Sequence, residues 1–350
     1  MNPTRRSVLA GLSAMALAPA LAACGADSEA GTTGTAGTDD STEGSAFPVT
    51  LTHKFGETTV EKAPTRVVCV GLTEQDALLA VGVVPIAVTE WFGDAPGFIF
   101  PWATDALEAA DGELPEVLSS TDGIDVEKVA SFAPDLIVGL YAGITDKEYE
   151  LLSKIAPTVA QPGDYADYGA PWDEMALTIG RAVGKQDEMQ VIVDDVKQQI
   201  ADAAAANPTF AGRTAMVVTP YEGLFVYGPE DPRSRMLVDL GFEFPTGVFG
   251  GPTDEFGESI SAERTADLDE VDVAVWLDLE TDEVVKGIFD ETTTAAEGRW
   301  FDISEEDGAY YVAHSFVTPL SIPYVLERYV PQLAAAVDAD PATVPPEAAA

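Results

Sequence analysis

The sequence predicts an α/β protein of two lobes, each built on a mostly parallel sheet flanked by helices, with a single long helix joining them. Short apolar segments of strand length alternate with segments of helical periodicity, which is the pattern of parallel α/β sheets. The order of these segments before residue 185 recurs after residue 208. With 350 residues, of which 46% are hydrophobic, the chain fits two folded units better than one.

The segment between the two lobes, residues 185–208, has the periodicity of one helix. Its apolar side chains recur every three or four positions and so share one helical face: Met189, Ile192, Val193, Val196, Ile200 and Ala203. Gly184 ends the pattern on one side, and Asn207-Pro208 ends it on the other. A helix of about 20 residues is about 30 Å long, so we expect it to connect the lobes as a rigid rod.

Residues 47–184 are expected to form the N-terminal lobe. An alternating segment typical of a hairpin begins it, over residues 49–60. Strand and helix patterns then alternate, with strands expected at 66–71, 83–88, 136–140 and 158–160 and helices at 73–81, 125–132 and 148–155. A loop rich in aromatic residues follows the second of these strands.

Residues 209–338 are expected to form the C-terminal lobe, and the Ala- and Pro-rich residues 339–350 a disordered tail. The expected strands are 215–219, 242–244 and 271–277, and the expected helices are 234–240 and 261–268. The stretches 126–138 and 262–275 each place a helix, then an Asp, then an apolar strand in the same order. This agreement indicates two lobes of one design.

The first 23 residues have the composition of a signal peptide. Arg5-Arg6 precede an apolar run that is shorter than a typical transmembrane helix. Leu21-Ala22-Ala23-Cys24-Gly25 is similar to a bacterial lipobox, which predicts cleavage before Cys24 and lipidation of its thiol. An ordinary signal peptide with a chance Cys is the alternative, and Tat and Sec export both stay open. Residues 24–46 contain no aromatic side chain and are expected to be the anchor and a flexible linker. The sequence thus predicts a body held at the extracytoplasmic face of the cell membrane.

Charge and composition exclude several classes of function. The net charge of −42, from 18 basic and 60 acidic residues, disfavours binding to nucleic acid. Only two His and two Cys are present, so a His cluster for zinc or manganese is unavailable and no protein metal site is expected. Cys69 lies in an apolar run and is expected to be a buried, inert thiol. Neither a nucleophile elbow, a zinc-protease motif nor a phosphate loop is present, so no catalytic residue and no enzyme are expected.

Aromatic and Arg side chains occur where the expected strands end. Trp91, Tyr141 and Tyr221 each follow a strand, and Arg233 and Arg235 open a helix after a Gly-Pro loop. Open α/β sheets bind ligands at the carboxyl ends of their strands, so these five residues are the candidate ligand-binding residues. The alternatives are that the aromatic residues belong to the core and that Arg235 pairs with an acid on its own helix.

Two acids, Glu127 and Glu263, fall in the first turn of corresponding helices in the two lobes. A carboxylate there stabilises a helix by facing the positive end of its dipole. The repetition across the lobes favours a second, simultaneous role at the surface.

Three motifs carry a family resemblance: residues 134–138 (PDLIV), 155–159 (IAPTV) and 180–184 (GRAVG). They resemble substrate-binding proteins of ABC importers, in the branch with a helical backbone that takes ferric siderophores, cobalamin or haem. Residues 98–102 and 228–235 are similar to actinobacterial members that bind iron siderophores. The resemblance covers roughly residues 47–337.

The resemblance implies a monomeric receptor that captures a ferric siderophore, which holds the iron in its own oxygens and so requires no cofactor or metal ligand from the protein. It implies that Glu127 and Glu263 dock into Arg pockets of an ABC permease. A cobalamin or haem receptor of the same fold is the nearest alternative. A lipid-anchored sensory or interaction protein is the alternative from another class.

Overall fold

The structure, a computed structural model, describes residues 46–121, 123–248 and 256–343. The predicted signal peptide, the lipidation site Cys24 and nearly all of the predicted linker lie outside these residues, as does most of the predicted tail. Among the described residues, no helix combines the length and the apolar character that crossing a membrane requires.

The N-terminal lobe is built on a five-stranded sheet in which every neighbouring pair is parallel. In spatial order its strands are β5 (Glu116–Leu118), β4 (Ala87–Thr89), β3 (Val67–Cys69), β6 (Leu136–Gly139) and β7 (Thr158–Ala160). An antiparallel hairpin precedes the sheet, formed by β1 (Val49–His53) and β2 (Gly56–Val60). The surrounding helices are η1 (Pro96–Phe98), α1 (Glu74–Ala80), α2 (Pro101–Ala109), α3 (Val126–Ser131), α4 (Asp146–Leu152) and α5 (Trp172–Ala182).

The C-terminal sheet is mixed, which corrects the expectation of a mostly parallel one. Its spatial order is β10 (Gly257–Ile260), β9 (Leu224–Tyr227), β8 (Ala215–Pro220), β11 (Val273–Leu277) and β12 (Trp300–Ile303). β8, β11 and β12 are parallel, but β9 and β10 add as antiparallel strands. A tight turn makes the β8–β9 hairpin possible, because Glu222 and Gly223 both adopt positive φ.

Two expected strands differ in the structure. The strand predicted over 83–88 is shortened to β4, because Pro85 has no N–H to donate to a ladder. Residues 242–244 form no strand and contribute only a bridge from Glu243 to Thr214. Phe242 is instead buried against the ring of Phe210, with 4.8 Å between the ring centroids.

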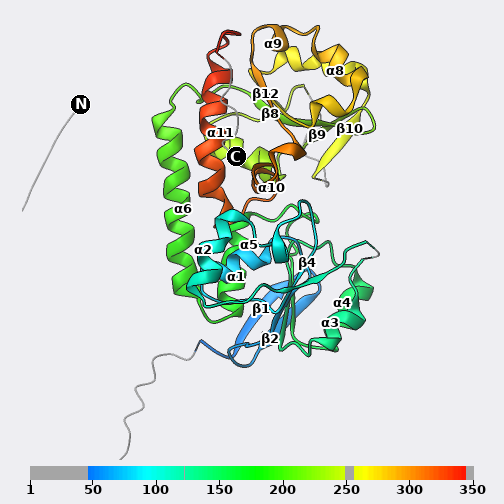
Figure 1. The fold of residues 1–350 in the computed structure, drawn as a ribbon, viewed down its shortest axis with the longest axis vertical. Helices are drawn as coiled ribbons and strands as arrows, with labels where there is room; N and C mark the ends of the chain where they lie inside the picture. Colours follow the sequence, from blue (N-terminus) through cyan, green and yellow to red (C-terminus); the bar gives the residue numbers. More distant parts are fainter. Residues whose placement is uncertain (1–45, 122, 249–255, 344–350) are drawn as a thin grey trace, which may run out of the picture. The chain divides into compact units, whose positions relative to one another are not determined.

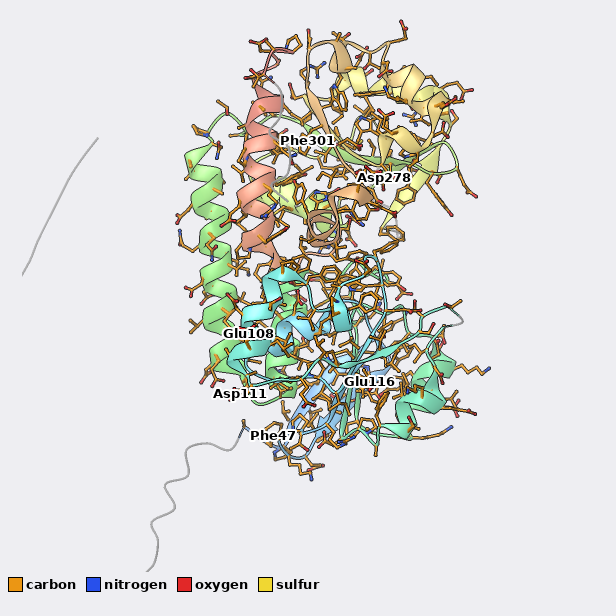
Figure 2. The ribbon with its side chains drawn as sticks, viewed as in Figure 1. Phe47, Glu108, Asp111, Glu116, Asp278 and Phe301 are labelled. Carbon is orange, nitrogen blue, oxygen red and sulfur yellow. The ribbon has the colours of Figure 1, made fainter. Side chains whose placement is uncertain are left out.

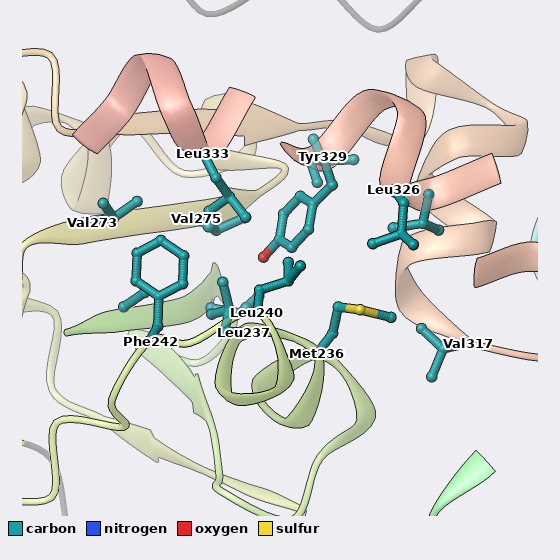
Figure 3. Close-up of a cluster of buried hydrophobic side chains, with 14 of the residues drawn as sticks. Met236, Leu237, Leu240, Phe242, Val273, Val275, Val317, Leu326, Tyr329 and Leu333 are labelled. Carbon is teal, nitrogen blue, oxygen red and sulfur yellow. The ribbon is translucent and has the colours of Figure 1, made fainter. Parts of the chain in front are cut away.

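The remaining helices surround the C-terminal sheet, and one of them joins the lobes. They are η2 (Ala262–Glu270), η3 (Leu279–Thr281), η4 (Glu305–Asp307), α6 (Gln186–Ala206), α7 (Pro232–Asp239), α8 (Glu283–Phe289), α9 (Thr293–Ala296), α10 (Ala309–Ser315) and α11 (Ser321–Val337). α11 runs beside α6 (Figure 1). Figure 3 shows Tyr329 and Leu333 of α11 facing Met236 and Leu237 of α7 in the core of this lobe.

The long helix predicted between the lobes is present as α6, with 21 residues. Its apolar face divides between two cores. Met189 and Val193 pack in the core of the N-terminal lobe, whereas Val196 and Ile200 pack in the core that contains α11. The fold prediction of two sheets flanked by helices and joined by one long helix is confirmed. The exact lobe boundaries remain a prediction.

The predicted repeat has a structural counterpart in two carboxylates. Asp135, just before β6, accepts hydrogen bonds from the backbone N–H of Thr65 at 2.9 Å and from its hydroxyl at 2.9 Å. Asp272, just before β11, accepts the same two bonds from Thr214, at 2.8 and 3.1 Å. Each Asp thereby ties the start of one strand to the start of its neighbour in the sheet.

Candidate ligand-binding site

The carboxyl ends of β3, β4, β5 and β6 meet at one edge of the N-terminal sheet, since these strands are parallel. A pocket of about 420 Å³ lies at this edge. We call it the carboxyl-edge pocket. Residues at or just after the ends of the four strands line it, together with residues around the starts of α3 and α4 and Tyr168 from the segment after β7: Leu72, Thr89, Ser119, Asp125, Ala142, Thr145, Glu148 and Tyr168. Its volume is that of a small-molecule site, which spans about 300–1,000 Å³ in proteins.

Tyr168 connects this pocket to a set of touching aromatic side chains. We call the set the aromatic cluster: Trp91, Phe92, Tyr141, Tyr168, Tyr227, Phe256 and Phe316, with Arg233. Trp91, which follows β4, lies 4.4 Å from Phe316 between ring centroids. The indole Nε1 of Trp91 is buried and has no hydrogen-bond partner among the described residues. It is a donor available for a ligand.

Tyr141 follows β6 and is buried in the aromatic cluster, 5.0 Å from Tyr168 and 6.1 Å from Phe316 between ring centroids. Its position is held from behind, because its backbone N–H donates to the buried carboxylate of Glu74 at 2.8 Å. Burial and then the charge of Asp231 raise the pKa of the Tyr141 phenol. The phenol therefore stays protonated at neutral pH and retains an O–H group.

Arg233 is the cation of the aromatic cluster. Asp231 caps α7 by accepting the backbone N–H of Arg233 at 2.9 Å, and it also accepts a side-chain bond from Nη1 of Arg233 at 2.8 Å. The guanidinium stacks 4.1 Å from the ring of Tyr227. Burial acts to lower the pKa of Arg233, but the charge of Asp231 outweighs it and the pKa is raised. Nε of Arg233 is buried without a hydrogen-bond partner among the described residues.

Arg235 lies in a different place from Arg233. Its guanidinium carbon is 5.5 Å from the ring of Tyr165. It lines a second pocket of about 570 Å³ beside α6, together with Trp172 and Asp239. We call this the helix-side pocket. Tyr221, the fifth candidate, lies in the turn between β8 and β9 with 60% of its surface exposed. The structure therefore brings Trp91, Tyr141 and Arg233 together, and leaves Arg235 and Tyr221 apart from them.

Several residues of the site had no signal in the sequence analysis. Tyr227 lies in β9 and Phe316 lies at the end of α10, and the sequence patterns predicted neither element. Ser119 lines the pocket because β5 ends at Leu118, and this strand was not predicted from the sequence.

The two acids predicted to dock a permease are both exposed in the first turn of short helical segments. Asp125 caps α3, two residues before Glu127, by accepting the backbone N–H of Lys128 at 2.9 Å. Hydrogen bonds from its own backbone N–H and from the Ser261 hydroxyl lower the pKa of Glu263. Both carboxylates are therefore accessible from solvent.

The described residues hold no group of three or more His, Cys, Asp or Glu side chains placed to bind a metal ion. The two His lie in separate elements. His53 contacts the hydroxyl of Thr58 at 2.9 Å, and burial, with the charge of Arg233, lowers the pKa of His314 to about 3.

Two lobes joined by one long helix, with a pocket at the strand ends, define a solute-binding protein. Residues 67–297 match the family described as periplasmic binding protein, so the chain belongs to this family. A periplasmic solute-binding protein of Mycobacterium smegmatis is 36% identical, with a TM-score of 0.71 over 83% of this chain and 98% of that chain. The iron-uptake ABC transporter substrate-binding protein PiaA of Streptococcus pneumoniae is 26% identical, with a TM-score of 0.70 over 83% of this chain and 100% of that chain.

Two curated relatives match a shorter part of the chain. The putative ABC transporter substrate-binding lipoprotein YhfQ of Bacillus subtilis is 29% identical over 62% of this chain and 65% of its own length, just under two thirds. The Fe(3+) dicitrate-binding periplasmic protein FecB of Escherichia coli is 26% identical over 61% of this chain and 67% of its own length. The family and these relatives are binding proteins, which confirms both the predicted resemblance and the prediction that the chain is not an enzyme.

Proposed function

We propose that this chain is an extracytoplasmic receptor that captures a ferric siderophore and delivers it to an ABC permease. The observation that carries the proposal is the carboxyl-edge pocket, which adjoins the aromatic cluster through Tyr168 and so combines a cavity with ring faces and the Arg233 guanidinium. A ferric siderophore already surrounds its iron with oxygen ligands. It needs aromatic surface and hydrogen-bond donors from the protein, and no protein metal ligand or cofactor.

The named relatives support this ligand class. One structure of PiaA from S. pneumoniae is a complex with ferrichrome, and that protein is 25% identical to this chain. The petrobactin-binding protein YclQ of B. subtilis is 27% identical over 71% of this chain. In our proposal Trp91, Tyr141 and Arg233 contact the ligand directly.

The proposal includes delivery as well as capture. The exposed carboxylates of Glu127 and Glu263, one on each lobe, contact basic sites of the permease, and the acidic surface speeds encounter with a basic partner. A lipid on Cys24 holds the monomeric receptor at the outer face of the membrane near the permease. YhfQ, whose name describes a lipoprotein, supports the anchoring.

Intrinsic fluorescence of the purified protein tests capture, because Trp91 lies in the aromatic cluster. The titrants are ferric hydroxamates, ferric catecholates, ferric citrate, haemin and cobalamin, with iron-free siderophores as controls. Saturable quenching by a ferric complex, and not by its iron-free form, is the expected result. A response to haemin or cobalamin alone would replace the siderophore with the alternative ligand of this fold. Silence across the panel would favour an interaction protein.

A further inference from the structure

The carboxyl-edge pocket is lined by negative charge. Its charged lining residues are Asp125 and Glu148, and no Lys or Arg is among the lining residues that the structure describes. Burial acts to raise the pKa of Glu148, but hydrogen bonds from the hydroxyl and the backbone N–H of Thr145 outweigh it and the pKa is lowered. Asp125 is exposed and caps α3. The Glu148 carboxylate is thus ionised at neutral pH.

Three hydroxyls of this pocket do not offset that charge. The Ser119 hydroxyl donates to the carboxylate of Glu90 at 2.6 Å, and the Thr145 hydroxyl donates to Glu148 at 2.6 Å. Thr89 donates to the carbonyl of Cys69 at 3.3 Å. These three O–H groups are therefore committed to acceptors of the protein itself.

The aromatic cluster adds one cation, and this cation is already paired. Asp231 forms a 2.8 Å ion pair with Arg233, in which the two side chains are 1% and 9% exposed. Burial first, and then the charge of Asp278, raise the pKa of the Tyr311 phenol, which also lies within reach of Arg233 and Glu305. Asp278, labelled in Figure 2, directly follows β11. Asp231 and Asp278 are thus two acids that act on the surroundings of Arg233.

An anionic ligand would meet this charge in a site partly shielded from water, where like charges repel more strongly than in solution. Three hydroxamates, each giving up one proton, neutralise ferric iron. Three catecholates, each giving up two, leave the complex with three negative charges. On the basis of the proposed function, we propose that this site selects ferric hydroxamates without net negative charge and rejects ferric catecholates and ferric citrate.

The donors that remain available suit this ligand class. Nε1 of Trp91 and Nε of Arg233 are buried without partners among the described residues. Each can donate to a hydroxamate oxygen, and neither requires the ligand to carry a net charge.

A charge series of ferric complexes tests the proposal with the purified protein. The series holds a neutral ferric trihydroxamate, a cationic one, ferric dicitrate and a ferric tris-catecholate, each titrated at low and high salt. The neutral and cationic complexes are expected to bind at least about tenfold more tightly than either anion. Salt screens charge repulsion, so the affinity for the anions is expected to rise with salt while that for the neutral complex stays constant.

Two variants extend the test to the residues that carry it. Asp231→Asn removes the acid that pairs with Arg233, so the positive charge of Arg233 is no longer neutralised. Asp125→Asn removes one pocket carboxylate, and Asn can still cap α3. Each is expected to raise the affinity for ferric dicitrate several-fold and to change the affinity for the neutral complex less. Glu108→Gln, on the exposed face of α2, makes the same charge change elsewhere and is expected to leave the ratio of affinities unchanged.

The outcomes separate this proposal from the proposed function. Tightest binding of an anionic ferric complex by the unaltered protein would overturn the charge selectivity and leave the siderophore receptor standing. Equal affinity for all four complexes would also overturn it. If no ferric complex binds at any salt concentration, the proposed function itself fails.

Discussion

The hydroxyl of Thr318 donates a 2.6 Å hydrogen bond to Oδ2 of Asp76, a residue 242 positions away in the chain. Asp76 lies in α1 of the N-terminal lobe, and Thr318 lies just before α11. The indole of Trp102 donates to the same oxygen at 2.7 Å, and the backbone N–H of Ser321 donates back to Thr318 at 2.9 Å. This buried chain of hydrogen bonds ties the start of α11 to the helices that cover the N-terminal sheet.

Asp76 is predicted to make stability depend on pH. Burial raises its pKa from 3.8 to about 6, although the Thr318 and Trp102 donors act against the rise. The unfolded chain ionises this group first, so its contribution to stability falls as pH rises from about 4 to about 6, by about 3 kcal/mol in all. Asp76→Asn does not titrate. Its stability relative to the unaltered protein is expected to increase over that range.

Urea unfolding at a series of pH values measures this difference. Asp105→Asn, an exposed change on α2, serves as the control and is expected to show no such trend. A constant difference between Asp76→Asn and the unaltered protein from pH 4 to pH 7 would show that the carboxyl is not perturbed.

Thr318→Val is predicted to destabilise the protein by about 1–3 kcal/mol, since it leaves the buried carboxylate of Asp76 with one donor fewer. The change keeps the side-chain shape and so isolates the hydroxyl. The urea midpoint is the measurement, and Thr52→Val on the exposed face of β1 is the matched control. An equal loss in both variants would assign the effect to the substitution type rather than to the bond.

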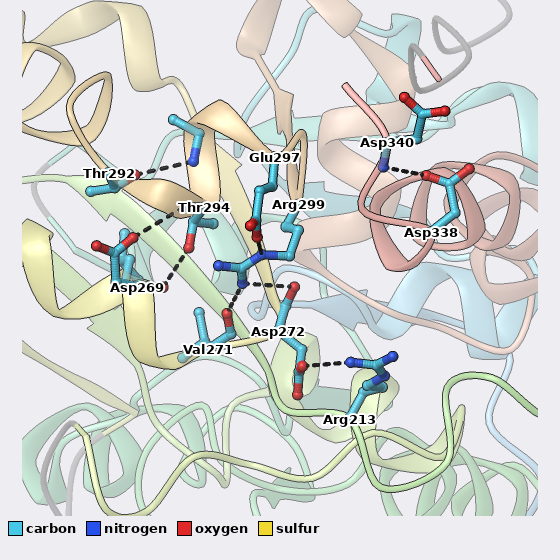
Figure 4. A network of polar contacts seen from close by, with 12 residues as sticks. Arg213, Asp269, Val271, Asp272, Thr292, Thr294, Glu297, Arg299, Asp338 and Asp340 are labelled. Atoms are coloured by element: carbon cyan, nitrogen blue, oxygen red, sulfur yellow. Dashed lines mark hydrogen bonds and ion pairs between the residues drawn. The ribbon is translucent and has the colours of Figure 1, made fainter. Parts of the chain in front are cut away.

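The paired acids Asp135 and Asp272 are predicted to protect the protein against acid. Burial acts to raise the pKa of each, but hydrogen bonds from the backbone N–H of Thr65 and Thr214, respectively, outweigh it and both pKa values are lowered. A lowered folded-state pKa contributes stability above the unfolded-state pKa, and this stability is lost as pH falls. Asp272 also pairs with Arg213, as Figure 4 shows.

Replacing either acid with Asn is therefore expected to reduce the stability of the protein at neutral pH. The stability of the variant should then fall less steeply than that of the unaltered protein as pH is lowered. The double variant should lose about the sum of the two, because the pairs belong to different sheets. Acid titration followed by circular dichroism measures this. If the acid midpoints of both single variants were unchanged, the hydrogen bonds to Asp135 and Asp272 would not stabilise the protein against acid.

Trp91→Phe is predicted to lower the affinity for the ferric ligand about tenfold with little change in stability. Phe retains the ring packing against Phe316 but lacks the buried Nε1 donor, which has no partner among the described residues. The control is Trp300→Phe, because Trp300 lies in β12, away from the pocket, and packs on Phe289 of α8. Calorimetric titration measures both. Equal affinities in the two variants would remove Trp91 from the proposed site.

Glu127→Gln and Glu263→Gln are predicted to impair delivery while leaving ligand affinity unchanged. Each removes one exposed carboxylate, so each single variant should lose part of the uptake activity and the double variant more. Uptake of radioactive iron by cells that depend on this receptor is the measurement, with Glu108→Gln as the control. Full uptake by the double variant would rule out the docking role.

The sequence predicts the features that periodicity and local chemistry encode. The long helix α6 has a strong three-and-four pattern, and the two Asp residues before β6 and β11 mark the repeat. β9 and β10, of four residues each, were not predicted. α11 was missed because Pro331 lies inside it, where proline usually signals a helix end.

The site was predicted less completely than the fold, and the geometry of one helix explains why. Arg233 and Arg235 are two positions apart, which is about 200° around an α-helix, so the two side chains cannot face one site. Arg233 stacks on Tyr227, whereas Arg235 faces Tyr165. Phe316 joins the aromatic cluster only through tertiary packing. Such contacts between distant segments leave no local pattern in the sequence.

Ligand capture is tested most directly by equilibrium titration of the purified protein with a neutral ferric trihydroxamate, followed by Trp fluorescence. We expect saturable quenching by the ferric complex at one site per chain and no quenching by the iron-free siderophore. The affinity of the Trp91→Phe variant is expected to be about tenfold lower. No saturable response to any ferric complex, or a response to haemin or cobalamin alone, would contradict it.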